Sequence, residues 1–155
     1  MGKLTEAIKI YKELVSIDKR YLPDLAAALN NLGDTLSKRR RLDEAMDKYK
    51  EALEVLEPLS DRPWLWGLIS KSHFEIACIL LKKKDKKNAA EHLCEALKML
   101  SDKRAPQNFI SRNLLFLCIL YLDGAIPEEL IPEECEKKLE FYFYGNTSWA
   151  GHNLL

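Results

Sequence analysis

One pattern of side chains recurs along this chain. It occupies residues 6–15, 44–53 and 88–97, so that successive copies begin 38 and 44 residues apart. In each copy an alanine is followed four residues later by a large side chain, and three residues after that by alanine or leucine: Ala7, Tyr11, Leu14; Ala45, Tyr49, Ala52; Ala89, Leu93, Ala96. Spacings of three and four place these residues on one face of a helix. A period of about 40 residues predicts stacked supersecondary units.

A second pattern precedes the later copies, and each of its occurrences follows a proline. The patterned segments are 29–36, 73–80 and 114–121, and the prolines are Pro23, Pro63 and Pro106. Proline is accepted in the first turn of a helix, so each proline predicts a helix start. Small residues such as Gly33 and Ala77 alternate with large ones, which lets two helices approach closely. Each repeat is therefore predicted to be an antiparallel helix pair stacked on the next.

The expected fold class is all-α, an α-solenoid of antiparallel helix pairs with about seven helices. We expect the helices near residues 4–18, 23–40, 43–58, 63–83, 87–101, 106–122 and 127–144. No alternation of period two extends far enough to predict a β-sheet.

We expect the chain to form a single domain over residues 1–155. Residues 4–18 are expected to form the second helix of a repeat whose first helix is absent. The expected parts that follow are repeats at 23–58 and 63–101, a degenerate repeat or cap at 106–144, and a tail at 145–155. Repeat arrays need capped ends. The first helix is therefore expected either to continue a longer array or to dock on another subunit.

The repeated residues carry a family resemblance. They are Leu29, Leu32, Gly33, Leu36, Ala45, Tyr49, Ala52 and Pro58, followed more loosely by His73, Ile76, Ala77, Leu80, Ala89, Leu93 and Ala96. This pattern resembles the tetratricopeptide repeat over roughly residues 4 to 122. The run 30–33 and the period above 40 resemble the longer repeats of kinesin-light-chain type. The resemblance implies a protein-interaction scaffold that binds a peptide or protein segment in a concave groove.

The resemblance also implies which residues face that groove. They are Ala27, Asn30, Asp34 and Ser37 in the first repeat, Lys71, Phe74, Cys78 and Leu81 in the second, and Ser111, Leu115, Ile119 and Leu122 in the third. Family members that bind chaperone C-termini clamp a carboxylate with a lysine and an asparagine. Asn30 and Asp34 occupy those places here, and Asp34 would repel a carboxylate, so that activity is not expected. Asn30 either contacts a ligand or makes a structural hydrogen bond.

The segment 109–122 is apolar on nearly every side, so something besides its repeat neighbours must cover it. The aromatic segment 141–155 is the first candidate. It is expected to be either a terminal cap or a tail that competes with a partner for the groove. An alternative function is homo-oligomeric assembly through the first helix and this tail.

Two basic runs are expected at the turns inside successive helix pairs. They contain Lys38, Arg39, Arg40 and Arg41 in the first and Lys82, Lys83, Lys84, Lys86 and Lys87 in the second. Equivalent turns stack along one edge of a solenoid, so the two runs should be neighbours. They are either a solvated edge that complements helix dipoles or a binding surface for an acidic protein or nucleic acid. Nucleic acid is disfavoured because no interleaved aromatic residues accompany the runs.

Composition narrows the remaining possibilities. Acidic and basic residues balance at 24 each, and no apolar run is long enough to span a membrane. The four widely spaced cysteines are predicted to be reduced core residues of a cytoplasmic protein, without a metal site. We expect His73 to be packed and His92 to be exposed. No catalytic arrangement or phosphate-binding loop is recognisable, so neither an enzyme nor a cofactor is expected.

Overall fold

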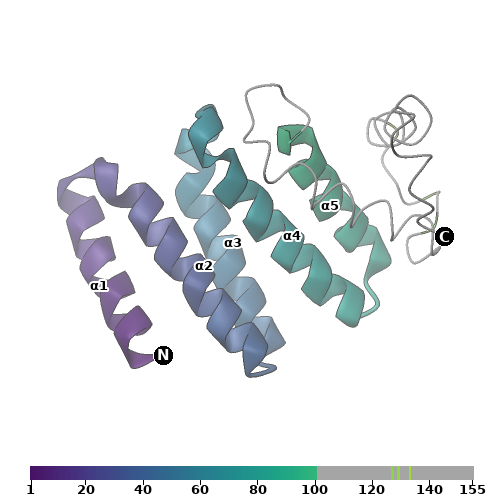
Figure 1. Cartoon of the computed structure of the whole chain (residues 1–155), viewed down its shortest axis with the longest axis horizontal. Helices are drawn as coiled ribbons and strands as arrows, with labels where there is room; N and C mark the ends of the chain where they lie inside the picture. Colours follow the sequence, from purple (N-terminus) through teal and green to yellow (C-terminus); the bar gives the residue numbers. More distant parts are fainter. Residues whose placement is uncertain (101–126, 128, 130–132, 134–155) are drawn as a thin grey trace, which may run out of the picture.

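The computed structural model of the chain describes residues 1–100 and the single positions 127, 129 and 133. Within this part the chain forms five α-helices and no strand: α1 (Gly2–Ile17), α2 (Leu22–Lys38), α3 (Leu42–Leu56), α4 (Trp66–Lys82) and α5 (Lys86–Leu100) (Figure 1). The predicted all-α solenoid class is confirmed. The helices expected near 106–122 and 127–144 and the tail at 145–155 fall outside the described residues, apart from those single positions.

The helix starts follow the local chemistry of the sequence. Pro23 lies in the first turn of α2, and Pro63 opens a short 3-10 turn, Pro63–Leu65, that leads into α4. The Asp18 carboxylate accepts a hydrogen bond of 2.9 Å from the backbone N–H of Arg20, which caps another 3-10 turn, Lys19–Tyr21. A third such turn, Glu57–Leu59, follows α3. These observed bounds agree closely with those expected from the prolines and the apolar spacing.

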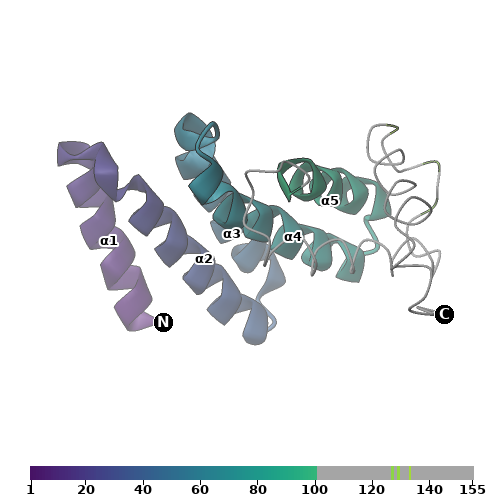
Figure 2. The ribbon, with the colours of Figure 1, turned by 45° about the horizontal axis from the view of Figure 1, so that its top comes forward.

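Successive helices run in opposite directions and lie in a row (Figures 1 and 2). The most extensive contacts are within the pairs α2–α3 and α4–α5, and α3–α4 and α1–α2 join the units. In Figure 1, α2 and α4 lie in front of the fainter α3. The second helix of the first pair, α3, therefore lies on the opposite face of the array from α2 and α4.

The core combines fully buried large side chains with small ones. Leu29, Tyr49, Leu56, Ile76 and Leu93 are fully buried, and alanines fill the neighbouring places on α3, α4 and α5. Burying each large apolar side chain contributes about 1.5–3 kcal/mol. The repeated pattern therefore encodes a continuous core that runs from one helix pair into the next.

Candidate functional site

The face formed by α2 and α4 holds the predicted groove residues. Ser37, Phe74 and Leu81 are half-buried there, and Phe74 and Leu81 pack against the core. Ala27 and Cys78 are also half-buried. The residues expected from the third repeat lie outside the described residues: Ser111, Leu115, Ile119 and Leu122.

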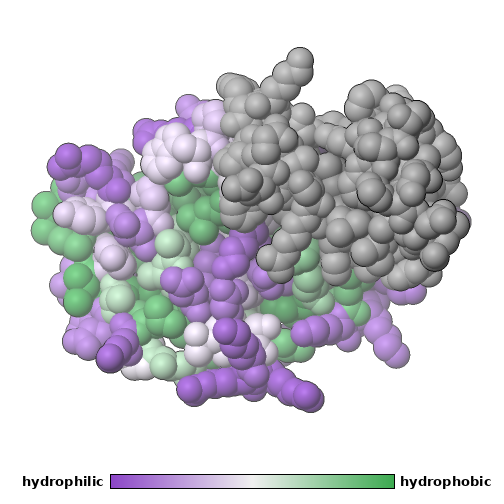
Figure 3. Space-filling view, in the orientation of Figure 1, coloured by the Kyte–Doolittle hydropathy of each residue, from purple (hydrophilic) through white to green (hydrophobic). Residues whose placement is uncertain are grey.

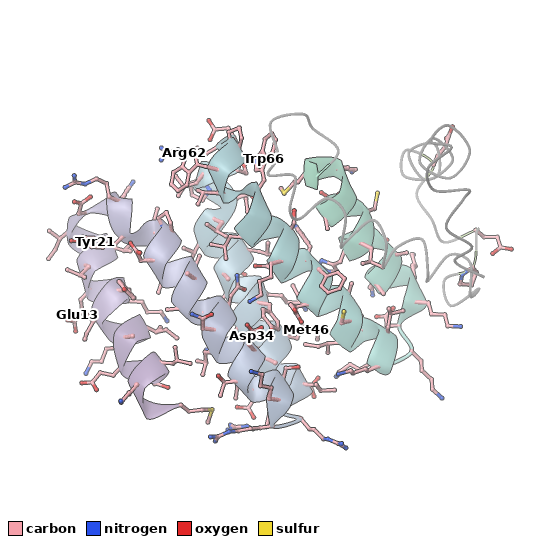
Figure 4. The ribbon with its side chains drawn as sticks, viewed as in Figure 1. Glu13, Tyr21, Asp34, Met46, Arg62 and Trp66 are labelled. Atoms are coloured by element: carbon pink, nitrogen blue, oxygen red, sulfur yellow. The ribbon has the colours of Figure 1, made fainter. Side chains whose placement is uncertain are left out.

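Asp34 and Lys71 form an ion pair that joins α2 to α4. The Lys71 ammonium donates to the Asp34 carboxylate at 2.7 Å, and the two side chains are 31–32% exposed. They are thus accessible to a ligand and yet partly shielded from water. Asp34 is labelled in Figure 4, which views the same side as Figure 1.

The buried Tyr49 of α3 forms a hydrogen bond with the Asp34 carboxylate of this ion pair. Its hydroxyl donates to the other oxygen of Asp34 at 2.5 Å. Burial raises the pKa of Tyr49 well above its ordinary value, and the hydrogen bond to the Asp34 carboxylate raises it further. The phenol therefore stays protonated and acts as a fixed donor. The sequence predicted Asp34 and Lys71 as site residues but did not indicate Tyr49 as their third partner. Asp34 and Tyr49 are 15 residues apart, on the two helices of one pair, and this spacing is the signal that could have indicated the contact.

Gly33 allows the Tyr49 ring to reach Asp34. A Cβ atom on Gly33 would lie 2.8 Å from two carbons of the ring. Such a distance is far below ordinary van der Waals contact. In the next pair Ala77 and Leu93 occupy the places of Gly33 and Tyr49, 44 residues later. The polar cluster of Asp34, Lys71 and Tyr49 is therefore not repeated by the second pair.

Asn30 lies in the interior, between α2 and α4. It is 1% exposed, and its carbonyl oxygen accepts a hydrogen bond of 3.0 Å from the buried Ser72 hydroxyl. Of the two roles expected for Asn30, this geometry is that of a structural bond. Among the described residues, the Asn30 amide nitrogen and the Ser70 hydroxyl are the buried side-chain atoms without a hydrogen-bond partner.

The two basic turns lie on one edge of the molecule, at the lower side of Figures 1 and 3. Lys83 of the second turn forms an ion pair with Asp43 at the start of α3. Arg41 pairs with Glu44. All nine basic residues of the two runs are exposed or partly exposed, so the structure brings these predicted residues together on one surface.

His73 and His92 form a pair between α4 and α5 that sequence reasoning missed. Their Nδ1 atoms lie 2.9 Å apart, so one ring donates a hydrogen bond to the other. Burial, and then the charge of His92, lower the pKa of His73 to about 4. The prediction that His92 is exposed is wrong, because it is partly buried against His73. Neither residue stands out in the sequence, since 19 positions separate them and only helix pairing brings them together.

Two of the cysteines lie in the described part. Cys78 is a reduced thiol, whereas Cys94 is buried and disulfide-bonded. The prediction that all four cysteines are reduced is therefore wrong for Cys94, because folding, not sequence spacing, decides which thiols meet. The described residues hold no group of three or more metal-binding side chains.

The first helix has an incompletely covered face. Ile10 is 49% and Ile17 85% exposed. Ala7 and Tyr11 are half-buried, while their counterparts on α3, Ala45 and Tyr49, are completely buried against α2. Within the described residues, α1 thus lacks the helix that covers this face in the next repeat.

Antiparallel helix pairs in a row, with one face lined by the first helix of each pair, define an α-solenoid repeat protein. Two sequence models of the tetratricopeptide repeat family match the chain, one over residues 1–57 and the other over residues 70–99. This chain is a tetratricopeptide repeat protein. Repeats of this family generally mediate protein–protein interaction and typically act as non-enzymatic scaffolds.

Two further comparisons add no closer relative. No curated protein and no solved structure matches the chain significantly. Over the described residues, none of the helices has both the length and the apolar character needed to cross a membrane.

Proposed function

We propose that this repeat protein is an interaction module that binds a peptide or protein segment across α2 and α4. The observation that carries the proposal is the partly exposed ion pair of Asp34 and Lys71, which spans two successive repeats. The pair offers a peptide both an acceptor and a donor. Because Tyr49 holds the Asp34 carboxylate in place, little side-chain entropy is lost when a ligand binds.

The surroundings of the ion pair indicate the class of ligand. Asp34 neutralises Lys71, which is therefore not free to clamp a C-terminal carboxylate. Ala27 and Ser37 are neutral and half-buried. We therefore expect a segment of low net charge that bonds to the ion pair through its backbone and packs small apolar side chains beside it.

Selection from a random peptide library, followed by affinity measurement on the selected peptides, tests this function. The blocking variant is Ala27→Lys with Ser37→Leu. It gives α2 the residue types that α4 carries at the equivalent places, Lys71 and Leu81. These substitutions suit the fold and should weaken binding at least tenfold by filling the face. Glu54→Lys, an exposed change on α3, is the control. Failure to enrich any motif, or equal binding by the blocking variant, would refute the proposal.

A second candidate function is self-association through α1. The exposed Ile10 and Ile17 favour it, because an isolated helix face with such residues gains from being covered. Light scattering across a range of protein concentrations should then give the mass of two chains at high concentration. The variant Ile10→Glu with Ile17→Glu should remain a single chain at every concentration. A natural chain that is already monomeric throughout that range excludes this function.

The 44-residue register favours the longer, kinesin-light-chain type of repeat. We also propose a single domain over 1–155 and a cytoplasmic location for a scaffold of this kind. Free-thiol counting on chain taken from cells tests the location. A reduced Cys94 would support the cytoplasm, whereas a Cys94 disulfide that persists in the cell would indicate an oxidising compartment and refute the proposal.

A further inference from the structure

The basic edge, defined by the nine basic residues of the two turns, is only partly explained by local structure. Lys38 and Lys82 lie in the last turns of α2 and α4, where a cation complements the helix dipole. Arg41 and Lys83 form the ion pairs with Glu44 and Asp43. The other five, which we call the unpaired cations, form no ion pair within the described residues: Arg39, Arg40, Lys84, Lys86 and Lys87.

Two of the unpaired cations occupy strained backbone positions. Arg40 has a φ of 61° and Lys84 a φ of 63°, in the left-handed region that glycine adopts readily. Each residue ends a helix in the same way. The N–H of Arg41 donates to the carbonyl of Leu36 at 3.0 Å, and that of Asp85 donates to Leu80 at 2.9 Å. Glycine is the usual residue at this position, so both turns hold a long cation where local stability favours glycine.

Two more unpaired cations oppose the dipole of their own helix. Lys86 and Lys87 open α5, and the first turn of that helix contains no acidic residue. The amino end of a helix carries partial positive charge and favours anions. Lys86 and Lys87 therefore weaken the start of α5. Four of the five unpaired cations therefore stand where local structure favours another residue: glycine at Arg40 and Lys84, and an acidic residue at Lys86 and Lys87.

We infer that the unpaired cations bind an acidic segment of a partner protein along this edge. Their side chains are exposed, and they come from two turns that the ion pair of Lys83 and Asp43 holds next to each other. Guanidinium and ammonium groups bind carboxylates through charge-assisted hydrogen bonds. The surface lies at the ends of the helices, beyond Ser37 and Leu81, so it borders the proposed groove and does not include the ion pair of Asp34 and Lys71.

The chemistry of the edge favours carboxylates in a peptide over nucleic acid. Neither turn contains an aromatic residue on which a base could stack. Asp43, Glu44 and Asp85 lie between the cations and would repel a continuous phosphate chain. A peptide can space its acidic residues to meet the two cationic turns and leave a neutral residue opposite the carboxylates.

Fluorescence anisotropy with a labelled peptide of alternating Glu and Ser tests the inference. The same peptide with Gln for Glu, and a labelled oligothymidine, are the comparison probes. The edge variant combines Arg40→Gly, Lys84→Gly, Lys86→Gln and Lys87→Gln. The glycines also relieve backbone strain, so this variant should fold at least as stably as the natural chain. A matched control removes the same charge elsewhere through Lys9→Gln, Lys19→Gln, Lys50→Gln and Arg62→Gln.

The natural chain should bind the acidic peptide, bind its Gln counterpart much more weakly, and lose affinity as salt is added. The edge variant should bind about tenfold more weakly, since each exposed ion pair contributes about a factor of two. The matched control should stay close to the natural chain. The inference is overturned if both variants lose affinity equally, if no saturable binding occurs, or if oligothymidine binds in an edge-dependent way and the acidic peptide does not.

Discussion

At the scale of single residues, the absence of a side chain at Gly33 is what gives the first helix pair its polar cluster. Substituting Gly33→Ala places a methyl group 2.8 Å from the Tyr49 ring. We expect the free energy of unfolding to fall by about 1–2 kcal/mol, because overpacking costs about 1–3 kcal/mol and alanine's better helix propensity returns up to about 1 kcal/mol. Urea denaturation followed by circular dichroism measures the change.

The second helix pair supplies the control for this prediction. Ala77 and Leu93 stand at the places of Gly33 and Tyr49 there, and both are completely buried. Adding Tyr49→Leu to Gly33→Ala should therefore recover part of the lost stability, although Tyr49→Leu alone removes the hydrogen bond to Asp34. Simple addition of the two single effects would show that the ring is not what the new methyl group meets.

The pair of His73 and His92 predicts that acid destabilises the packing of α4 on α5. The pKa of His73 is lowered from 6.5 to about 4 by burial and by the charge of His92. Between these values the unfolded chain binds more protons than the folded chain, so stability falls as pH decreases through this window. The expected loss is on the order of 2 kcal/mol between pH 7 and pH 4. Burial and the charge of Lys50 also lower the pKa of His92, while Glu91 and Glu95 oppose that shift.

Denaturation curves at several pH values, compared between the natural chain and His73→Leu, isolate this effect. Leucine is the residue at the equivalent place in the first repeat, where Leu29 is completely buried. The variant should keep the acid sensitivity of the carboxylates and lose the part that lies between pH 6.5 and 4. Parallel pH profiles for the two chains would contradict the assignment.

At the scale of helices and turns, we expect glycine substitutions in the two basic turns to raise the stability of the protein. Arg40→Gly and Lys84→Gly each place glycine in a left-handed conformation that costs a residue with a side chain roughly 1 kcal/mol. Each substitution should raise the free energy of unfolding by up to about 1 kcal/mol, and the two effects should add because each relieves strain in its own backbone. Thermal and urea denaturation check the sum. A loss of stability would mean that these side chains make contacts that outweigh the strain.

Helix boundaries were predictable because they depend on local chemistry. Pro23 and Pro63 mark the starts of α2 and of the turn before α4, and apolar spacing fixed the remaining bounds closely. The left-handed turns were not predictable, since no glycine occurs at residue 40 or 84. Asn30 had two possible roles because its burial depends on Ser72 of another helix. Contacts between distant positions, such as Tyr49 with Asp34, depend on side-chain directions that spacing alone does not give.

At the scale of the whole molecule, the described helices form a linear array. Each helix packs mainly on its neighbours in sequence, from α1 on α2 to α4 on α5. In such an array stability is approximately a sum of repeat and interface terms, so a local defect propagates only to adjacent units. The first helix, with its partly uncovered face, should be the least protected of α1, α2 and α3.

Native-state hydrogen exchange read by mass spectrometry tests this linear coupling with two core substitutions. Leu29→Ala, in the middle of α2, should cost about 2–5 kcal/mol and speed exchange in α1, α2 and α3 together, because α2 contacts both of its neighbours. Ile8→Ala, on the end helix, should speed exchange in α1 and leave α4 and α5 at their natural rates. Uniform acceleration from α1 to α5 by Ile8→Ala would instead mean that the helices unfold as one cooperative unit. Local unfolding of α1 would then leave α2 and α4 folded, with the ion pair of Asp34 and Lys71 in place.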